Sequence, residues 1–158
     1  TALSFLDLNH TVTVIDNLDT GHFQLIPKKA QFIKGDVSDK NLINEVLKSK
    51  KYDAAIHFAG SIEVEESMLN PEKYFYNNTQ KSKIFFDTCI ENKLTNFVFS
   101  STAAVYGETS KFVTEETPLN PLNPYAESKI QIENYLKMLS NKNLANFICL
   151  YRLTYSSR

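Results

Sequence analysis

The sequence predicts an α/β fold built on a doubly wound parallel sheet. Five short apolar segments, rich in β-branched and aromatic residues, recur along the chain at residues 11–16, 30–36, 53–60, 96–101 and 146–151. Their nearly continuous apolar character is typical of strands that are buried on both faces. Segments with helical spacing lie between them. This alternation indicates βαβ units, in which helices cover both faces of one parallel sheet.

Three helices are expected between these strands. The first begins after Asp39, whose side chain is the expected helix cap. Its apolar stripe consists of Leu42, Ile43, Val46 and Leu47. The second covers residues 74–90 and the third covers residues 125–139. Residues 107–124 hold three of the five prolines and are predicted to form a loop that leads into the third helix.

The composition excludes several classes of protein. The chain has 158 residues and a net charge of −1, enough for one core but without the basic excess of a nucleic-acid or membrane-surface binder. No apolar run reaches the ~20 residues needed to span a bilayer, and no signal peptide is evident. Cys89 and Cys149 lie in apolar segments, which favours free thiols, and no metal-ligand spacing is present. These features predict a cytoplasmic protein without a metal, nucleic-acid or membrane partner.

Both ends of the sequence are unusual for a complete domain of this class. Residues 1–10 have the pattern of the end of an amphipathic helix, with no strand before it. The four glycines are Gly21, Gly35, Gly60 and Gly107, so no G-x-G-x-x-G turn exists. We therefore expect residues 1–158 to form a partial domain that lacks its first strand and glycine-rich turn. Because that strand lies in the middle of such a sheet, a gap is expected there.

Acidic residues follow the first two predicted strands. Asp16, at the end of the first, could accept hydrogen bonds from ribose hydroxyls and disfavour a 2′-phosphate, which would favour NAD over NADP. It could equally be a turn residue before Asn17. Asp36 ends the second strand, where adenine contacts occur in such folds, although a role in a turn is the alternative.

Small and hydroxyl residues follow the next two strands. Ala59 and Gly60 would let a ligand approach the backbone closely, whereas His57 is expected to pack in the core. Residues 100–102 provide three hydroxyls at the carboxyl end of a buried strand, where ligands bind in open parallel sheets. A hydroxyl there could bond a sugar hydroxyl, although the cluster could also simply begin a loop.

Tyr125 and Lys129 are four residues apart and would be neighbours on the third helix. A free phenol is a poor base at neutral pH, but a nearby ammonium and the positive nicotinamide ring of an oxidised cofactor both favour the phenolate. Such a group can accept the proton of an alcohol while hydride leaves the same carbon. Two long side chains covering a helix surface are the alternative interpretation.

Taken together, the segments TVTVIDNLDTG, GDVSD, HFAG, FVFSSTAAVYGE and NPYAESK closely resemble the extended short-chain dehydrogenase/reductase family, over residues 1–150. The resemblance implies a Rossmann-like NAD-binding domain. It further implies NAD-dependent epimerisation at carbon 4 of a UDP-hexose, the interconversion of UDP-glucose and UDP-galactose in galactose metabolism. The reaction passes through a 4-keto sugar and the cofactor stays bound.

The resemblance also implies roles for individual residues. Tyr125 would be the catalytic base, Lys129 would promote its ionisation and hold the nicotinamide ribose, and Thr102 would bind the sugar hydroxyl. The remaining cofactor contacts would come from Asp16, Asn17 and Leu18 at the adenosine ribose, Asp36 and Val37 at the adenine, Phe58, Ala59 and Gly60 along the cofactor, and Asn77. A homodimer formed through the helices at 74–90 and 125–139 is expected of the intact protein.

The sequence departs from the family pattern at four places. The glycine-rich turn is absent, and Ile62 stands where some epimerases have a lysine. Residues 151–158 replace a family segment of the R-Y-F-N type, which we interpret as a reading-frame shift near Cys149. The uridine-binding C-terminal portion is also absent, so we expect the 158-residue chain alone to be inactive.

Other activities of the family remain open. Ala103 and Ala104 follow Thr102, where a 4,6-dehydratase needs an acidic pair, and this argues against dehydration. Other nucleotide-sugar epimerases and decarboxylases, or a non-catalytic truncated relative, are the alternatives.

Overall fold

The computed structural model describes residues 1–108 and 112–152, with Arg152 described by its backbone alone. The strands are β1 Thr13–Asp16, β2 Gln31–Lys34, β3 Ala55–His57, β4 Asn96–Thr102 and β5 Asn146–Arg152. The helices are α1 Ala2–Asp7, α2 Lys40–Ser49, α3 Val64–Leu69, α4 Pro71–Tyr74, α5 Lys81–Glu91 and α6 Pro124–Asn141. Two 3-10 turns, η1 Phe23–Leu25 and η3 Ala103–Tyr106, and a π-helical segment, η2 Phe75–Gln80, complete the fold. All five predicted strands are confirmed.

The strands form two parallel sheets rather than one. β1 pairs with β2, and β3, β4 and β5 pair in that order, with every pair parallel. Within the described residues no strand is hydrogen-bonded between β1 and β3. The backbone groups on the facing edges of β1 and β3 therefore lack a ladder partner, as expected for a doubly wound sheet without its central strand.

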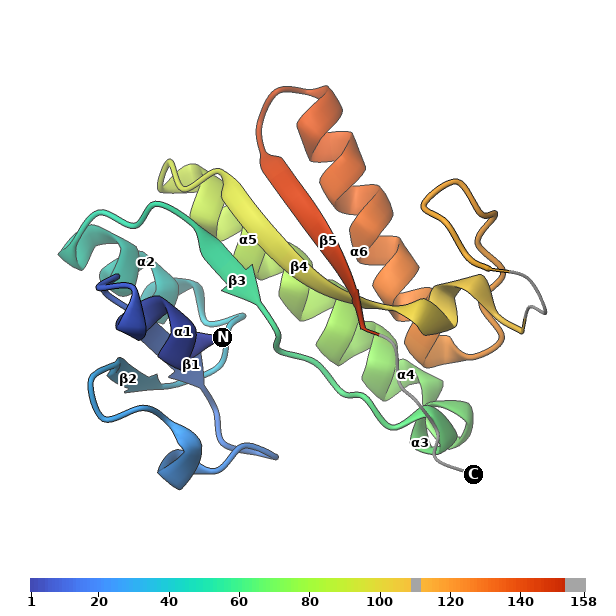
Figure 1. The fold of residues 1–158 in the computed structure, drawn as a ribbon, viewed down its shortest axis with the longest axis horizontal. Helices are drawn as coiled ribbons and strands as arrows, with labels where there is room; N and C mark the ends of the chain where they lie inside the picture. The colour runs from blue at the N-terminus through green and yellow to red at the C-terminus, as the bar shows by residue number, and fades with distance from the viewer. Residues whose placement is uncertain (109–111, 153–158) are drawn as a thin grey trace.

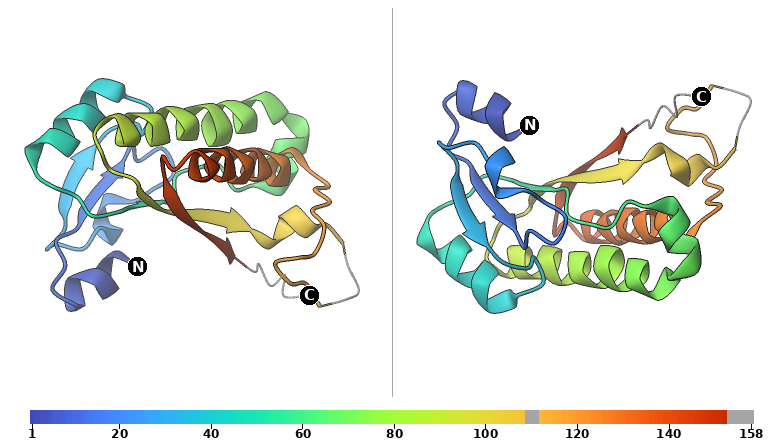
Figure 2. Two further views of the ribbon diagram at one scale, coloured as in Figure 1. Left: turned by 90° about the horizontal axis from the view of Figure 1, so that it is seen from above. Right: turned by 90° about the horizontal axis from the view of Figure 1, so that it is seen from below.

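Side chains and helices bridge the two sheets. The Thr13 hydroxyl at the start of β1 lies 3.1 Å from the Tyr52 hydroxyl, just before β3. In the helix layer α2 packs against α5, and Asn92 donates to the Asn44 side chain at 2.6 Å. Figures 1 and 2 show α2, α5 and α6 on one side of the strands and α1 on the other. This two-sided arrangement is that of the predicted doubly wound fold.

The helices begin where side chains can satisfy their first backbone amides. The Asp39 carboxylate accepts from the amides of Asn41 and Leu42, so its predicted role as a cap is confirmed. The Asn123 side chain caps α6 by accepting from the Ala126 amide at 2.8 Å, and Pro124 opens the helix. The start of α6, with Tyr125 in its first turn, is thus well defined.

The hydrophobic core lies between the three-stranded sheet and the helices α2, α5 and α6. Its fully buried members include Ile43, Phe86, Phe99, Ile132 and Leu136. Aromatic rings pack edge to face through it, with Phe86 contacting both Phe97 and Phe99. β4 and the inner face of α6 are therefore the most firmly embedded elements of the chain.

Two regions differ from the sequence-based expectation. The helix predicted at 74–90 begins earlier and is continuous through α4, η2 and α5, with a π-helical segment across Asn77 and Asn78. Such π segments are frequent at functional sites. α3 was not predicted, because a six-residue helix carries too little periodicity to recognise. The reading-frame shift near Cys149 was inferred from residues 151–158. Of these, residues 153–158 lie outside the part of the chain that the structure describes.

A search of the described helices finds none that combines the length and the apolarity required to cross a bilayer.

Candidate functional site

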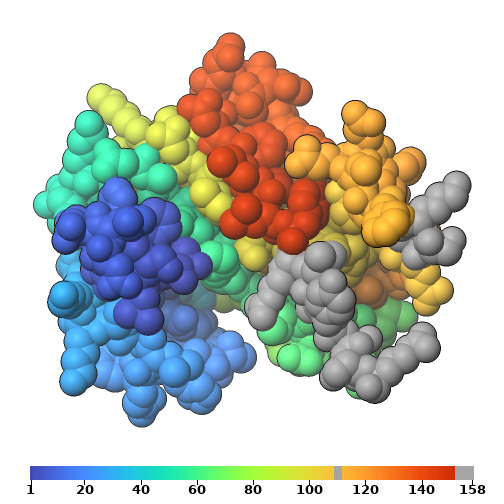
Figure 3. All heavy atoms as spheres, viewed as in Figure 1, coloured from blue at the N-terminus to red at the C-terminus, as the bar shows by residue number. Residues whose placement is uncertain are grey.

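The predicted site residues gather at the carboxyl ends of the strands. β4 ends at Thr102 and β3 ends at His57, and the first turns of α6 pack against β4 and against the turn η3 that follows it. The space-filling view shows a hollow at the lower edge of the molecule, between the blue N-terminal residues and the green surface of the α3–α4 region (Figure 3). Ligands bind at this end of open parallel sheets.

Lys129 is the most strongly perturbed cation of the site. Its side chain is only 3% exposed, and its Nζ donates to the Ser100 carbonyl at 3.0 Å. The same nitrogen lies 5.0 Å from the centre of the Phe99 ring. Burial lowers the pKa of Lys129 from 10.5 to about 8. One donor hydrogen is used by Ser100, so the ammonium retains the capacity to bind a ligand hydroxyl.

Tyr125 lies one turn before Lys129 on the same face of α6, as the spacing predicts. Its ring is partly buried and packs edge to face against Tyr74, with ring centres 6.4 Å apart. Tyr74 is itself fully buried, and its hydroxyl donates to the Glu63 carbonyl and to the Glu66 carboxylate. Burial and Glu66 raise the pKa of Tyr74 to about 12, so it stays protonated and supports the Tyr125 ring.

The hydroxyl cluster at the end of β4 is built into the core. Ser101 and Thr102 are 2% and 3% exposed. Thr102 Oγ1 accepts from the Ala104 amide at 3.2 Å and caps η3, which fits the loop-starting role considered for this cluster. Thr102 keeps its hydroxyl proton available to a ligand, so the capping role and the predicted sugar contact are compatible.

The backbone at Gly60 lies close to the Lys129 ammonium. An added Cβ at Gly60 would lie 3.0 Å from Asn78 Oδ1 and 3.5 Å from Lys129 Nζ. Asn78 is buried and holds this segment through bonds with the Ser61 amide and carbonyl at 2.7 and 3.0 Å. Asn77, the predicted cofactor contact, donates to the Ser61 hydroxyl at 3.0 Å. The sequence analysis therefore missed Asn78, although it lies in the same N-N pair.

Phe58 and Ala59 are open to solvent, and Phe58 is 51% exposed despite its aromatic ring. An exposed apolar side chain at the carboxyl end of a strand is suited to lining a bound ligand. His57 points the other way and is buried against Phe85, Phe86 and Phe99. Its predicted packing role agrees with this environment.

Asp16 closes a tight turn at the end of β1. Its Oδ1 accepts from the Leu18 amide at 2.7 Å, and Leu18 has a positive φ of 63°. The side-chain amide of Asn17 donates a hydrogen bond to the Asp19 carboxylate. Gly21 approaches the same carboxylate so closely that an added Cβ would lie 3.0 Å from either oxygen. The turn role is therefore present, and Oδ2 remains available for the predicted ribose contact.

Asp36 is held by a cation that the sequence analysis missed. Its Oδ2 pairs with Lys81 at 2.5 Å, and its Oδ1 accepts from the amide and hydroxyl of Ser38. Partial burial raises the pKa of Asp36, but the bonds from Lys81 and Ser38 outweigh it and lower the pKa overall. Val37 beside it is half-buried. No sequence signal links Lys81 to a residue 45 positions away.

The structure brings the predicted residues together in two groups. Tyr125, Lys129, Thr102 and Gly60 come from α6 and the three-stranded sheet, whereas Asp16 and Asp36 follow the strands of the two-stranded sheet. No group of three or more His, Cys, Asp or Glu side chains suitable for a metal occurs among the residues that the structure describes.

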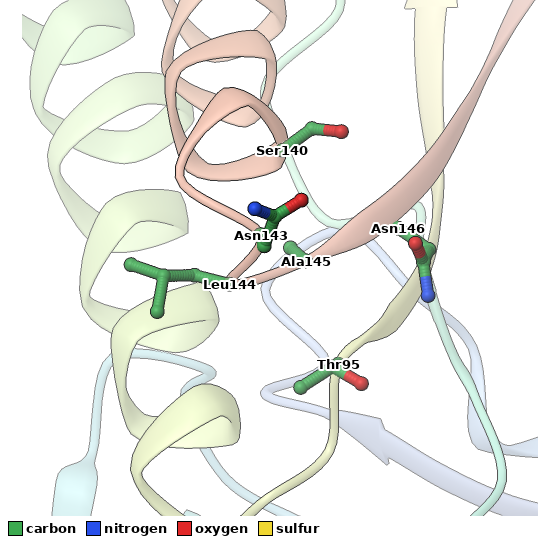
Figure 4. Close-up of a pocket in the computed structure, with 6 residues that line it drawn as sticks. All are labelled: Thr95, Ser140, Asn143, Leu144, Ala145 and Asn146. Atoms are coloured by element: carbon green, nitrogen blue, oxygen red, sulfur yellow. The ribbon is translucent and has the colours of Figure 1, made fainter.

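A small pocket of about 170 Å³ lies at the opposite end of the molecule (Figure 4). It is lined by Thr95, Ser140, Asn143, Leu144, Ala145 and Asn146, around the amino ends of β4 and β5. None of these side chains is charged. This pocket is therefore separate from the candidate site.

The parallel sheets and the helices that cover them have the Rossmann-like architecture of dinucleotide-binding proteins of the short-chain dehydrogenase/reductase type. Residues 1–155 match the model of the NAD dependent epimerase/dehydratase family, and the chain belongs to this family. The cofactor of the family is NAD. The glycine-rich turn for the pyrophosphate is not among the 158 residues.

Individual relatives agree with this assignment. The chain is 40% identical over 126 residues to UDP-glucose 4-epimerase of Lactobacillus helveticus, covering 79% of this chain and 38% of that protein. It is 33% identical over 161 residues to UDP-arabinose 4-epimerase 1 of Arabidopsis thaliana, covering 95% of this chain and 38% of that protein. The crystal structure of UDP-glucose 4-epimerase from Brucella ovis in complex with NAD matches with a TM-score of 0.91 and 31% identity, covering 95% of this chain and 46% of that one. The chain thus spans less than half the length of these relatives.

Proposed function

We propose that the intact protein containing these residues catalyses NAD-dependent epimerisation at carbon 4 of a UDP-hexose, interconverting UDP-glucose and UDP-galactose in galactose metabolism. The observation that carries the proposal is the buried Lys129 ammonium at the carboxyl end of β4, one helical turn from Tyr125. The similarity to UDP-glucose 4-epimerases supports the choice of substrate.

In this proposal each residue has a role that its surroundings support. Tyr125 accepts the proton of the sugar 4-hydroxyl and later returns it, and Lys129 stabilises the phenolate and binds a ribose hydroxyl. Thr102 donates to the same sugar oxygen and fixes its position. NAD, when bound, accepts hydride from carbon 4 and returns it to the opposite face of the 4-keto sugar. Asp16, Asn17 and Leu18 bind the adenosine ribose.

The remaining proposed contacts complete the cofactor site. Asp36 and Val37 flank the adenine, and Asn77 lies beside the cofactor with Phe58, Ala59 and Gly60. The ion pair with Lys81 holds the Asp36 carboxylate at the edge of this site. A cytoplasmic location remains a prediction.

A homodimer is proposed through the outer surfaces of α5 and α6. These helices are joined by a hydrogen bond from the Tyr135 hydroxyl to the Asp87 carboxylate, and the Lys83 ammonium lies over the Tyr135 ring. These contacts hold α5 and α6 side by side, so that their outer surfaces form one face for a second copy of the chain.

A UDP-pentose is the second candidate substrate, because the chain is also similar to a UDP-arabinose 4-epimerase. Dehydration is disfavoured, because Ala103 and Ala104 occupy the turn after Thr102 and offer no acid.

The test is a chimera in which the part of this chain that matches the Lactobacillus helveticus enzyme replaces the corresponding segment of that enzyme. We expect the chimera to convert UDP-galactose to UDP-glucose, measured by chromatography of the sugar nucleotides, with UDP-arabinose assayed in parallel. Tyr125→Phe should reduce turnover by about 10²-fold or more. Tyr135→Phe, which removes a phenol from the same helix on its outer side, is the control.

A folded chimera that retains NAD but converts neither sugar would refute the proposal. The 158-residue chain itself is expected to show no turnover in the same assay. Conversion by this chain alone would show that the expectation of inactivity is wrong.

A further inference from the structure

The buried carboxylate of Glu133 has no role in the proposed chemistry and lies two turns after Tyr125 on α6. It is fully buried, at 0% exposure. Glutamate is almost never fully buried unless it is paired. Within the described residues the ion pairs are Lys73–Glu66 and Lys81–Asp36, and Glu133 takes part in neither. Other partners must therefore satisfy its two oxygens inside the protein.

Two hydroxyl groups hold the Glu133 carboxylate, one on each oxygen. Ser101 donates a hydrogen bond to Oε1, and Tyr151 donates to Oε2 at 2.9 Å. The first hydroxyl comes from β4 and the second from β5, so Glu133 joins α6 to both neighbouring strands. Hydrogen bonds to a charged acceptor are roughly twice as strong as those between neutral groups.

The bond to Ser101 lies directly beside the catalytic groups. Ser101 follows Ser100, whose carbonyl accepts from Lys129, and precedes Thr102. Ser100 and Ser101, at the end of β4, are thus hydrogen-bonded to two residues one turn apart on α6.

We propose that Glu133 is a positioning residue: by binding Ser101 it sets the register between α6, which carries Tyr125 and Lys129, and the end of β4, which carries Thr102. The inference deepens the proposed function, since it concerns the same site. Tyr151 extends the network to β5, and its ring also packs on Tyr106 of η3, the turn that Thr102 caps.

The test uses two readouts in the 158-residue chain, neither of which needs NAD or turnover. The first is the pKa of Lys129, followed by the carbon shifts of lysine-labelled protein and assigned with Lys129→Met. The titratable groups around Lys129 are His57 of β3 and Tyr125 and Glu133 of α6, and burial keeps the His57 ring neutral above pH 4. The second readout is hydrogen exchange of the Ala104 amide, which is bonded to Thr102 Oγ1.

Ser101→Ala should shift the Lys129 pKa from about 8 toward 10.5 and accelerate exchange at Ala104 relative to the amides of β3. Glu133→Gln keeps one acceptor for Ser101, so both changes should be smaller. Tyr135→Phe is the matched control, because it also removes a hydrogen bond between a hydroxyl and a carboxylate of α6, but one that joins α6 to α5 and not to β4. It should leave both readouts unchanged.

The proposal is overturned if Ser101→Ala and Glu133→Gln resemble Tyr135→Phe in both readouts. If Ser101→Ala does not fold, as judged by circular dichroism, the nearly isosteric Glu133→Gln decides alone. Because neither measurement depends on epimerase activity, failure of the proposed function would leave this result intact.

Discussion

Replacing Lys129 by methionine should stabilise the chain at neutral pH. The ammonium is buried, and burial lowers the pKa of Lys129 from 10.5 to about 8. That difference corresponds to about 3 kcal/mol of unfavourable free energy when the lysine is charged. Loss of the hydrogen bond to the Ser100 carbonyl costs about 1 kcal/mol. Lys129→Met should therefore raise the free energy of unfolding by about 2 kcal/mol at pH 7.

The effect should depend on pH in a defined direction. Between pH 8 and 10.5 the unfolded chain keeps the Lys129 proton while the folded chain has lost it. The wild-type protein therefore gains stability from this group as pH rises, by up to about 1.4 kcal/mol per pH unit. Methionine does not titrate, so the advantage of the variant should shrink across this window.

Urea unfolding followed by circular dichroism at pH 7, 8, 9 and 9.5 measures both effects. The difference between variant and wild type isolates Lys129, because other groups titrate alike in the two proteins. Lys137→Met, an exposed change on the same helix, is the control and should show no such pH dependence. A Lys129→Met variant less stable than wild type at pH 7, or a difference independent of pH, would refute the reasoning.

Three further changes test other parts of the fold. Asp39→Ala removes the cap of α2 and should lower the free energy of unfolding by about 1 kcal/mol in urea titrations, whereas a change near zero would contradict the capping role. Gly107→Ala places a Cβ 2.3 Å from the Asn120 carbonyl oxygen, at a residue whose φ is 67°. The free energy of unfolding should therefore fall by about 1–3 kcal/mol in the same assay, and a variant as stable as wild type would be inconsistent with this geometry. The ring signals of His57 should not titrate between pH 5 and 8 in NMR spectra, because burial lowers its pKa to about 3; a midpoint near 6.5 would show that the ring is hydrated.

The strands and the two long helices could be predicted because their signals are local. Continuous apolar segments identify buried parallel strands, and the Tyr125–Lys129 spacing places both residues on one helix face. Asp39 was recognisable as a cap because it directly precedes a periodic segment. Each of these inferences depends on residues within a few positions of one another.

The contacts that the sequence did not indicate are all long-range. Lys81 reaches Asp36, and Glu133 reaches Ser101 and Tyr151, through the packing of helices on the sheet. Glutamate on a helix is ordinarily assigned to the solvent face, so nothing in the local pattern reveals that Glu133 is buried. Asn78 was missed because its neighbour Asn77 matches the same motif equally well.

The division of the strands into two sheets has a consequence for how cooperatively the chain unfolds. Every second residue of β4 from Phe97 to Ser101 is buried in the core, whereas no residue of β1 or β2 is fully buried. Between the two sheets, cohesion comes from side chains such as Tyr52 and Asn92 and not from a continuous ladder of backbone hydrogen bonds. In the 158-residue chain we therefore expect the β1–β2 unit to open more readily than the β3–β4–β5 unit. In that chain, backbone amides near Asp16 and Asp36 should exchange with solvent faster than those near Tyr125 and Lys129.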